Sequence, residues 1–459
     1  MSEFAWKKYD EKELETVMKF SDDYMDFLSN SKTERACVKN AIALAKKNGY
    51  VDIKDVIKNK TSLKPQDKVY VNMMNKSLAF MHIGQNNLEE GMNILGAHID
   101  SPRLDLKQNP LYEDGNIAYL DTHYYGGVKK YQWVTIPLAI HGVVVLKDGT
   151  TLDIAIGDKE DDPVFVISDL LIHLSGDQLQ KKASSVIDGE DLNVTVGSIP
   201  LDGEEKDAVK ANVVKLLKSN YGFDEEDFVS AELEVVPAGR ARSCGFDSSM
   251  VLGYGHDDRV CAYTSLVAQL EAKDLKRTGV CLLVDKEEVG SIGATGMQSR
   301  FFETFVAEVL NAMGQYSELA VKRAMANSTM LSSDVAAAHD PIYASASSPR
   351  NQAEFGKGVV FAKYTGARGK SACNDANAEF MALIRNIMDT NNVSWQTSEL
   401  GKVDQGGGGT IAYILAQYGM QVIDCGVALH NMHAPNELAS KADIYEAYKC
   451  YEAFLKYEG

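Results

Sequence analysis

Two adjacent glutamates, Glu287 and Glu288, directly follow the short apolar run Val280–Val284 and its turn. Such a run is typical of a buried central strand, so the glutamates are expected at the carboxyl end of that strand. Ligands bind at this end in open α/β sheets, and the three glycines between positions 290 and 296 would let the backbone turn tightly around a site. Taken alone, the pair could equally belong to a solvated turn, because charged pairs are common on protein surfaces.

A second polar pair, His98 and Asp100, ends a strand expected at Met92–Ala97, in the stretch GAHIDSPRLDLK. Residues two apart on a strand point to the same side. A histidine that binds a metal usually donates its other ring N–H to an oxygen such as a carboxylate, and Asp100 could supply one. An isolated H-x-D is more often an ordinary polar strand end, so the pair needs further support.

Three more polar residues stand where predicted strands end or helices begin: Asp257, Asp334 and His433. Singly, they could be a helix N-cap, a turn residue, and one of a loop pair with His430. Together with the two pairs above, they form a carboxylate-rich set that contains two histidines. Imidazole and carboxylate are ligands that zinc, manganese and cobalt accept without thiolates. The combination indicates a pair of divalent ions, with one bridging carboxylate and one unligated carboxylate acting as a base.

The elements that would position these residues alternate between strand and helix. Near the N-terminus, Thr33 can cap a helix that stops at Gly49. From Asp257 onward predicted strands and helices alternate along the chain, and the last predicted helix is KADIYEAYKCYEAFLKY. This alternation predicts an α/β fold with a mixed, mainly parallel sheet flanked on both faces by helices.

The middle of the chain has a different character. Apolar runs follow one another closely in WVTIPLAIHGVVVLKDGTTLDIAIG, PVFVISDLLIHL, LNVTVGSIPL and FVSAELEVVP, and Asp148-Gly149 is a type I′ hairpin signal. One helix is expected at about Asp207–Asn220. We therefore expect a mainly β module at 109–237, inserted between two parts of a catalytic domain at 1–108 and 238–459.

A glycine run at Gly406–Gly409 precedes the helix expected in TIAYILAQYG. The run lacks the lysine and hydroxyl residue of a P-loop and does not fit G-x-G-x-x-G after a strand. Close helix packing, or backbone lying near a substrate, is therefore favoured over a phosphate cradle.

Composition excludes several kinds of partner. The net charge of −18 argues against nucleic acid or an anionic membrane, because both require a basic surface. The charged start and the lack of any run of 18 apolar residues predict a soluble, cytoplasmic protein. The seven cysteines are scattered without C-x-x-C spacing, so neither a disulfide framework nor a thiolate zinc site is expected.

The segments GAHIDSPRLDLK, HDDRV, DKEEVGS, SSDVAAAH and MHAPNE, in this order, resemble the five signature segments of the aspartyl aminopeptidase family, which includes vacuolar aminopeptidase I. The resemblance covers nearly the whole chain, including an insertion of the expected size. It implies a zinc-exopeptidase core that holds two divalent ions, with zinc as the first candidate and manganese or cobalt as the others. The implied activity is hydrolysis of the N-terminal residue, acidic or neutral, from peptides with a free N-terminus.

The resemblance also implies individual roles. One ion would be held by His98, Asp257 and Asp334, and the other by Asp257, Glu288 and His433. Glu287 would be the general base that takes a proton from the attacking water, and Asp100 would orient His98. The adjacency of the glutamates then has a reason, since one must bind metal while its neighbour stays available for the proton.

Two departures from the family pattern bear on specificity. The insertion reads KKYQWVTIPLAI where the family has a tryptophan-rich Asp-Arg motif, and Asp169 stands where members selective for acidic residues tend to have a histidine. Lys363, in FAKYTG, is the candidate for contact with an acidic substrate side chain. If Asp169 of a partner subunit reaches the same pocket, it should weaken that preference.

The inserted module is expected to serve as a dimerisation domain, and the resemblance implies dimers that build a dodecamer. Two other function classes remain open at this point. A related dinuclear deacylase or carboxypeptidase could use similar ligands, and a non-catalytic shell-forming scaffold could share the fold. A scaffold would be expected to have lost ligands, whereas every ligand position is filled. Only an aminopeptidase requires a free N-terminal amine, so N-acetylated peptides would separate it from the related enzymes.

Overall fold

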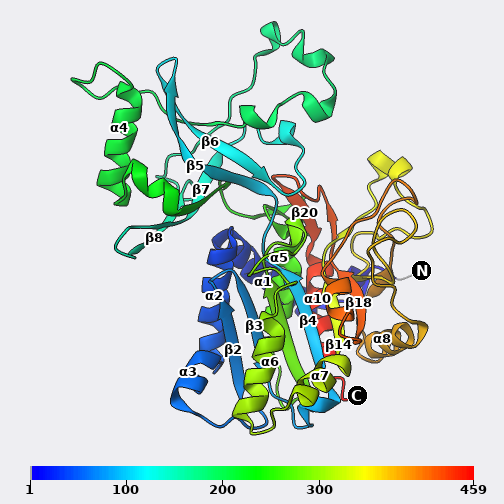
Figure 1. Ribbon diagram of the computed structural model, residues 1–459. Helices are drawn as coiled ribbons and strands as arrows, with labels where there is room; N and C mark the ends of the chain where they lie inside the picture. Colours follow the sequence, from blue (N-terminus) through cyan, green and yellow to red (C-terminus); the bar gives the residue numbers. More distant parts are fainter. Residues whose placement is uncertain (1–2) are drawn as a thin grey trace. The chain divides into compact units, whose positions relative to one another are not determined.

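A computed structural model describes residues 3–459 and divides them into two compact units (Figure 1). The first unit comprises the chain up to Asp100, then Ala241–Met432 and Glu437–Gly459. The second comprises Ser101–Arg240 and the short segment His433–Asn436. The two units are described separately below.

The first unit is built on a nine-stranded sheet in the order β1-β2-β3-β13-β4-β14-β18-β16-β17. Within residues 3–459, five of its eight strand pairings are parallel. The mixed, mainly parallel sheet predicted from the sequence is therefore confirmed. The strands are β1 Val51–Asp52, β2 Lys68–Met73, β3 Ser77–His82, β4 Met92–His98, β13 Thr278–Val284, β14 Thr329–Ser333, β16 Val359–Ala362, β17 Trp395–Thr397 and β18 Gln421–Gly426.

Helices cover both faces of this sheet. One face carries α1 Glu11–Asn30, α2 Glu34–Lys47, α5 His256–Glu271, α8 Ala378–Thr390 and α10 Lys441–Leu455. The other carries α3 Ile53–Asn59, α6 Phe301–Ala312, α7 Glu318–Ala326 and α9 Ala412–Ala416. Alternation along β13 divides its side chains between the faces, since Cys281 and Leu283 join the first core whereas Leu282 joins the second. The continuous apolar run of β13 therefore reflects burial on both sides.

Local signals define the helix ends. The Thr33 hydroxyl accepts a hydrogen bond from the Ala36 N–H at 3.1 Å and caps α2, as predicted. Gly49, with a φ of +83°, follows the end of the same helix. Asp10 and Glu13 form a reciprocal capping box at the start of α1.

A five-stranded sheet completes the first unit and extends beyond the carboxyl ends of β14 and β18. Its order is β11-β12-β20-β19-β15. The strands are β11 Arg242–Cys244, β12 Met250–Gly253, β15 Ala336–Ala337, β19 Ala428–His430 and β20 Glu437–Ser440. Because β12 leads into α5, this sheet anchors the chain just before Asp257.

The second unit is mainly β, as predicted. Its antiparallel sheet has the order β8-β7-β10-β5-β6-β9. The strands are β5 Arg103–Asp114, β6 Ile117–Tyr125, β7 Leu138–Val145, β8 Thr151–Ile156, β9 Val194–Gly197 and β10 Ala231–Pro237. The helix α4, Ala208–Leu216, packs on β5, β6 and β9 and continues as a π-helical turn, η8, at Leu217–Tyr221.

Two local predictions for this unit were wrong. The hairpin at Asp148-Gly149 exists, but its turn is not type I′, because Gly149 has a positive φ of +87° and Asp148 does not. The Gly149 N–H donates to the Leu146 carbonyl at 2.9 Å, and the Asp148 carboxylate accepts from the Thr150 N–H at 2.8 Å. This side-chain bond stabilises a type I turn followed by a left-handed glycine, the common three-residue alternative.

The second wrong prediction concerns PVFVISDLLIHL, which was expected to resemble the neighbouring strands. It forms two isolated bridges, through Phe165 and Val166, and then a 3-10 turn, η4, at Ile172–Leu174. The bridges join Phe165 to Leu138 of β7 and Val166 to Thr195 of β9, and neither extends beyond a single residue pair. Ile167 is buried, but the apolar side chains from Leu170 onward remain on the surface, with Ile172 70% exposed.

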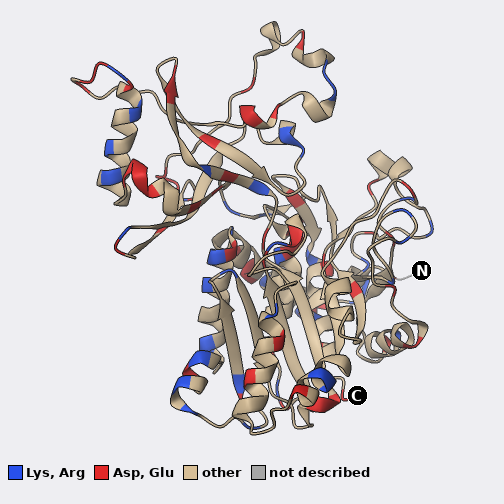
Figure 2. Ribbon diagram, viewed as in Figure 1, with Lys and Arg blue, Asp and Glu red and all other residues tan. Residues whose placement is uncertain are grey.

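Acidic and basic residues are interspersed along most elements, and Lys and Arg recur on α2, α3 and α4 (Figure 2). No helix within residues 3–459 combines the length and apolar character needed to cross a membrane.

Candidate metal centre

Three neighbouring strands bring the predicted residues to one edge of the nine-stranded sheet. His98 ends β4, Glu287 and Glu288 follow β13, and Asp334 follows β14. Because these strands are parallel neighbours, their carboxyl ends meet at this edge. Asp257 arrives from the first turn of α5. The ligand atoms of His98, Asp257 and Asp334 lie within 4.8 Å of one another, as do those of His98, Glu287 and Glu288.

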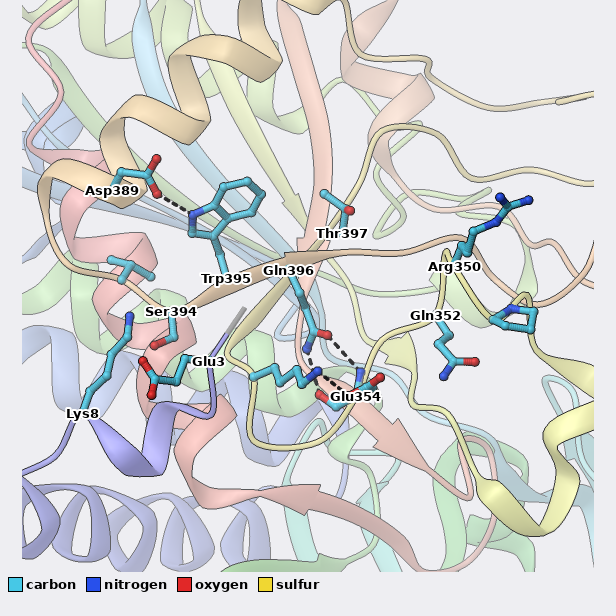
Figure 3. A pocket seen from close by; sticks show the side chains of 13 residues that line it. Glu3, Lys8, Arg350, Gln352, Glu354, Asp389, Ser394, Trp395, Gln396 and Thr397 are labelled. Atoms are coloured by element: carbon cyan, nitrogen blue, oxygen red, sulfur yellow. Dashed lines mark hydrogen bonds and ion pairs between the residues drawn. The ribbon is translucent and has the colours of Figure 1, made fainter. Parts of the chain in front are cut away.

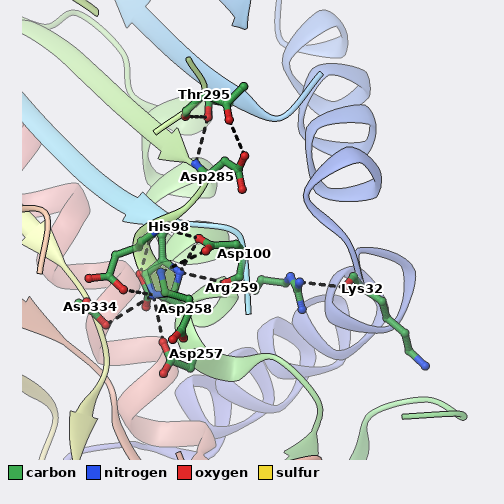
Figure 4. Close-up of polar contacts among 12 residues, drawn as sticks. Lys32, His98, Asp100, Asp257, Asp258, Arg259, Asp285, Thr295 and Asp334 are labelled. Carbon is green, nitrogen blue, oxygen red and sulfur yellow. Dashed lines mark hydrogen bonds and ion pairs between the residues drawn. The ribbon is translucent and has the colours of Figure 1, made fainter. Parts of the chain in front are cut away.

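His98 lies in the middle of the cluster, with aspartates next to both of its ring nitrogens (Figure 4). Its Nε2 lies 3.1 Å from Asp257 Oδ1, 3.8 Å from Asp334 Oδ1 and 4.0 Å from Glu287 Oε2. On the other side of the ring, Nδ1 lies 2.9 Å from the Asp100 carbonyl oxygen and 3.3 Å from its Oδ1. Nδ1–H therefore donates to Asp100, and Nε2 is the nitrogen that faces the carboxylates. A proton on Nε2 is shared with Asp257, and a divalent ion would bind Nε2 in place of that proton.

Asp100 also holds the loop that carries the two glutamates. Its Oδ1 accepts the backbone N–H of Glu287, and its Oδ2 accepts that of Glu288, both at 3.1 Å. The side chain is fully buried, so these hydrogen bonds are shielded from water. Asp100 thus links the orientation of His98 to the position of both glutamates, which is more than the sequence predicted.

Two residues that sequence reasoning missed fix the start of α5. The Asp257 N–H donates to Glu437 Oε2 at 3.0 Å, and the Asp258 Oδ2 accepts the His98 N–H at 3.3 Å. Asp257 is not the N-cap of α5, since Gly255 occupies that position. The only sequence signals for these roles are the adjacent aspartates of HDDRV and the glutamate that follows MHAPN.

The electrostatics of the centre favour a cation. Burial raises the pKa of Asp334 well above its usual value, and the nearby Asp258 and Glu287 add to that rise against the opposing effect of His98. Burial would lower the pKa of His98, but hydrogen bonds to Asp100 and Asp257 outweigh burial and raise it. Several carboxylates thus share a poorly hydrated space with one imidazole. A divalent ion would neutralise them, and their oxygen and nitrogen donors match zinc or manganese.

His433 lies in the loop between β19 and β20, in the short segment grouped with the second unit. Its Nδ1 is 3.0 Å from the Gly127 carbonyl oxygen, so Nδ1–H donates and the lone pair belongs to Nε2. This tautomer suits a ligand, and the assignment of His433 to the second ion stays a prediction.

The two predicted specificity residues have partners within their own units. Lys363 follows β16, and its Nζ lies 2.6 Å from Asp375 Oδ1, while Lys370 reaches the other carboxylate oxygen at 2.8 Å. These two lysines hold the pKa of Asp375 below its usual value. Asp169 is exposed and accepts hydrogen bonds from the Leu170 N–H and the Gln178 amide, both at 2.8 Å.

Another buried carboxylate, Asp424 on β18, was also missed. It is 3% exposed, and its Oδ1 accepts a hydrogen bond from the Thr410 hydroxyl at 2.5 Å. Burial raises the pKa of Asp424 to about 7, the Thr410 bond opposes that rise, and Glu287 adds to it. Thr410 directly follows the glycine run Gly406–Gly409, so its hydrogen bond to Asp424 holds the end of this run against β18.

A separate cleft of about 740 Å³ lies at the edge strand β17 of the first unit (Figure 3). The residues that line it include Trp395, whose indole N–H donates to Asp389 at 2.8 Å, and Lys357, which pairs with Glu354 at 2.5 Å. Its described lining contains no histidine and none of the residues predicted to be catalytic. We therefore place the chemistry at the carboxyl edge of the sheet.

Comparisons with known proteins agree with this placement. Residues 27–455 match the family described as aminopeptidase I zinc metalloprotease (M18). The chain is 62% identical to a probable M18 family aminopeptidase 1 of Clostridium acetobutylicum over 98% of this chain and 97% of the relative. The crystal structure of an M18 family aminopeptidase from Thermotoga maritima superposes with a TM-score of 0.94 at 45% identity, covering 99% of each chain. A dodecamer of S. cerevisiae mApe1, at 19% identity and a TM-score of 0.77 over 96% of this chain and 97% of that one, shares the fold.

Proposed function

Because this chain belongs to the aminopeptidase I (M18) family of zinc metalloproteases and is an aminopeptidase, we propose that it uses two divalent ions, zinc first among them, to remove acidic or neutral N-terminal residues from peptides. The observation that carries the proposal is the convergence of His98, Asp257 and Asp334 beside the Glu287–Glu288 pair. The family assignment leaves no reason to retain a deacylase, a carboxypeptidase or a scaffold.

The residues divide into ligands and a base. His98 through Nε2, Asp257 and Asp334 would hold one ion, and Asp257, Glu288 and His433 would hold the other. Bound divalent ions would polarise the scissile carbonyl and lower the pKa of the attacking water. Manganese or cobalt could replace zinc, because the donors are imidazole and carboxylate only.

Glu287 would be the general base of the reaction. Asp100 fixes its backbone, and its Oε2 lies within 4.0 Å of His98 Nε2, at the rim of the ligand cluster. From there the carboxylate can take the proton of the attacking water and return it to the departing amine. Glu288, one residue later, shares the Asp100 anchor, and the resemblance assigns it the second ion.

Replacing each glutamate by glutamine tests this division. Glu287→Gln should lower kcat by several orders of magnitude and leave the metal content close to that of the parent, because it removes the base but no ligand. Glu288→Gln should lose metal. Metal analysis and peptide hydrolysis on both variants are the measurements, and each variant is the matched control for the other.

A metal-poor Glu287→Gln together with a metal-replete Glu288→Gln would reverse the two roles. His433→Ala should behave as Glu288→Gln does, with loss of metal. If His433→Ala kept its full metal content, His433 would be removed from the proposed ligand set.

The substrate preference should be less exclusively acidic than the resemblance implies. Lys363 is the proposed cation for an acidic side chain, but Asp375 already pairs with it, so an acidic substrate must compete for that charge. Asp169 of a partner subunit would oppose the same substrates if it reaches the pocket.

We therefore expect Asp169→His and Asp375→Asn each to raise kcat/KM for Asp- and Glu-terminated peptides relative to Leu- and Lys-terminated ones. A several-fold shift is expected for each, because one opposing charge is removed. An unchanged profile after Asp169→His would remove Asp169 from the pocket, and an unchanged profile after Asp375→Asn would do the same for Lys363.

The second unit is proposed to mediate self-association, first as dimers and then as a dodecamer. Support comes from the apolar segment Leu170–Leu179, in which Ile172 is 70% and Leu174 is 67% exposed. Surfaces of this kind usually mark a protein interface. The fold is shared with the S. cerevisiae dodecamer, which is compatible with an assembly of this size.

Two further assignments belong to the proposal. We place the protein in the cytoplasm, supported by seven cysteines that are all free thiols, five of them buried. We also retain the division into catalytic parts at 1–108 and 238–459 around an inserted assembly module at 109–237. Expression of residues 101–240, which keep β5 whole, with circular dichroism as the readout, would test whether the module folds independently.

A further inference from the structure

An apolar cavity of about 230 Å³ lies in the second unit, between its sheet and the helix α4. All six strands contribute to its wall, for example through Ile140 of β7 and Ile154 of β8. The opposite wall comes from Val213 of α4 and from the turn that follows the helix. None of the residues that line this cavity is among those proposed to bind metal or to act as the base.

The helix changes its geometry where it borders this cavity. The α-helical part of α4 ends at Leu216, and the next five residues, Leu217–Tyr221, form a π-helical turn. Leu217, Asn220 and Tyr221 of this turn all line the cavity. A π-helical turn is wider than an α-helical one, is rare, and is found disproportionately at functional sites. The widened turn is therefore a second and independent indication of a ligand site.

The lining determines which chemical class would bind. Apart from Asn220 and Tyr221, the side chains that form the wall are hydrocarbon. A charged ligand would lose its hydration without compensation there, so the occupant must be uncharged. A dry cavity of about 150 Å³ accepts benzene, and the larger volume here suits a bicyclic ring of about the size of indole.

Two phenylalanines favour an aromatic occupant over an aliphatic one. The Phe223 and Phe228 rings, both in the wall, meet edge to face with their centroids 5.5 Å apart. A third ring placed beside them would gain the same quadrupolar attraction. The polar groups of Asn220 and Tyr221 could take up one N–H or O–H of the ligand.

We propose that the second unit binds one small, uncharged aromatic molecule, with indole as the representative probe, in the cavity between its sheet and the π-helical turn. The proposal does not depend on the metal centre or on the peptide substrate. It assigns a ligand site to a unit whose proposed role is assembly.

Calorimetric titration of the full-length, assembled protein with indole tests the site. We expect one indole per chain, and at least tenfold weaker binding of the zwitterion tryptophan, whose charges the cavity cannot hydrate. No detectable heat at indole concentrations near its solubility limit would overturn the proposal. Equal affinity for indole and tryptophan would also overturn it.

Variants locate the binding. Val213→Phe and Leu217→Trp each place a larger side chain in the cavity and should weaken indole binding at least tenfold. Val214→Phe is the matched control, because Val214 lies on the same helix but does not line the cavity. Unchanged circular dichroism and thermal unfolding in all three variants would verify that the fold is intact. Equal losses of affinity in Val214→Phe and in the two cavity variants would contradict the assigned location.

Discussion

Asp424 is a buried acid that is not itself assigned to the metal centre, and it makes stability depend on pH in a definite direction. Only 3% of the residue is exposed, and its Oδ2 has no hydrogen-bond partner among residues 3–459. Burial raises its pKa in the folded protein to about 7, whereas an aspartate in an unfolded chain titrates near 3.9. Between these values the folded state keeps a proton that the unfolded state has released. The free energy of unfolding therefore falls as pH rises from about 4 to about 7.

Asp424→Asn removes this titration and keeps an oxygen that can accept the Thr410 hydroxyl hydrogen bond. Relative to the parent, the variant should gain about 3 kcal/mol of stability between pH 4.5 and pH 8, from a shift of roughly three pKa units. Urea unfolding of metal-free protein across this range measures the difference. The exposed Glu318→Gln is the control and should give a flat difference. A flat line for Asp424→Asn as well would show that Asp424 does not titrate in this window.

At the residue scale, the catalytic set could be predicted because its members sit at strand ends that the sequence marks. His98 and Glu287 follow apolar runs whose length and composition indicate buried strands. Glu437 could not be found in this way, because its function is a hydrogen bond to the backbone of Asp257, 180 residues earlier. Asp424 was missed for a similar reason, since its burial depends on how the glycine run folds over β18.

At the element scale, the backbone conformation of Gly358 controls how β16 begins. Its φ is +88°, and an added Cβ would overlap the carbonyl oxygen of Ser394, whose chain leads into β17. Its N–H also donates to Asp443 Oδ1 at 2.7 Å, which ties the start of β16 to α10. The site tolerates only glycine for two separable reasons, the left-handed backbone and the close approach of another chain segment.

Gly419 is the comparison that isolates the effect of the left-handed backbone. It has the same φ of +88°, but no atom lies within 4 Å of the point that a Cβ would occupy. Gly419→Ala should cost about 1–2 kcal/mol, the usual penalty for a left-handed residue with a Cβ. Gly358→Ala should cost several kcal/mol more, because the backbone around Ser394 must move. Thermal unfolding of both variants gives the comparison. Equal losses would mean that β16 and β17 can separate at no cost.

Helices and strands were predicted correctly where an apolar run is buried in the structure or where a capping residue marks the end of the helix. β13, β4 and α2 lie where apolar runs and the Thr33 cap placed them. The prediction for the segment after Pro163 failed because its apolar residues resemble those of a strand, yet the apolar side chains from Leu170 onward are exposed. Hydrophobic periodicity reports that a segment has an apolar face, but it does not reveal whether the partner of that face lies in the same chain.

At the scale of the whole molecule, this exposed segment bears on how copies of the chain associate. Leu170, Leu171, Ile172 and Leu174 are each 45–70% exposed, close to one another in sequence on the second unit. Leaving these side chains in water costs free energy that a second copy could recover by covering them. Asp169, the proposed specificity residue, directly precedes them, so association would also place its carboxylate near a partner subunit.

Ile172→Asp combined with Leu174→Asp should therefore break the assembly. Each substitution places a charge in a contact that would exclude water, and an unpaired buried charge costs more than the lost apolar contact. Light scattering should show a particle at least twofold smaller than the parent at the same concentration. The control is Leu319→Asp on α7 of the first unit, where the side chain is 54% exposed and the assembly mass should not change.

If the double variant kept the mass of the parent, or if the parent were already an active monomer, the second unit would not be the assembly module. If the smaller particle also gained preference for Asp- and Glu-terminated peptides, the loss of Asp169 from a neighbouring active site would be the direct explanation.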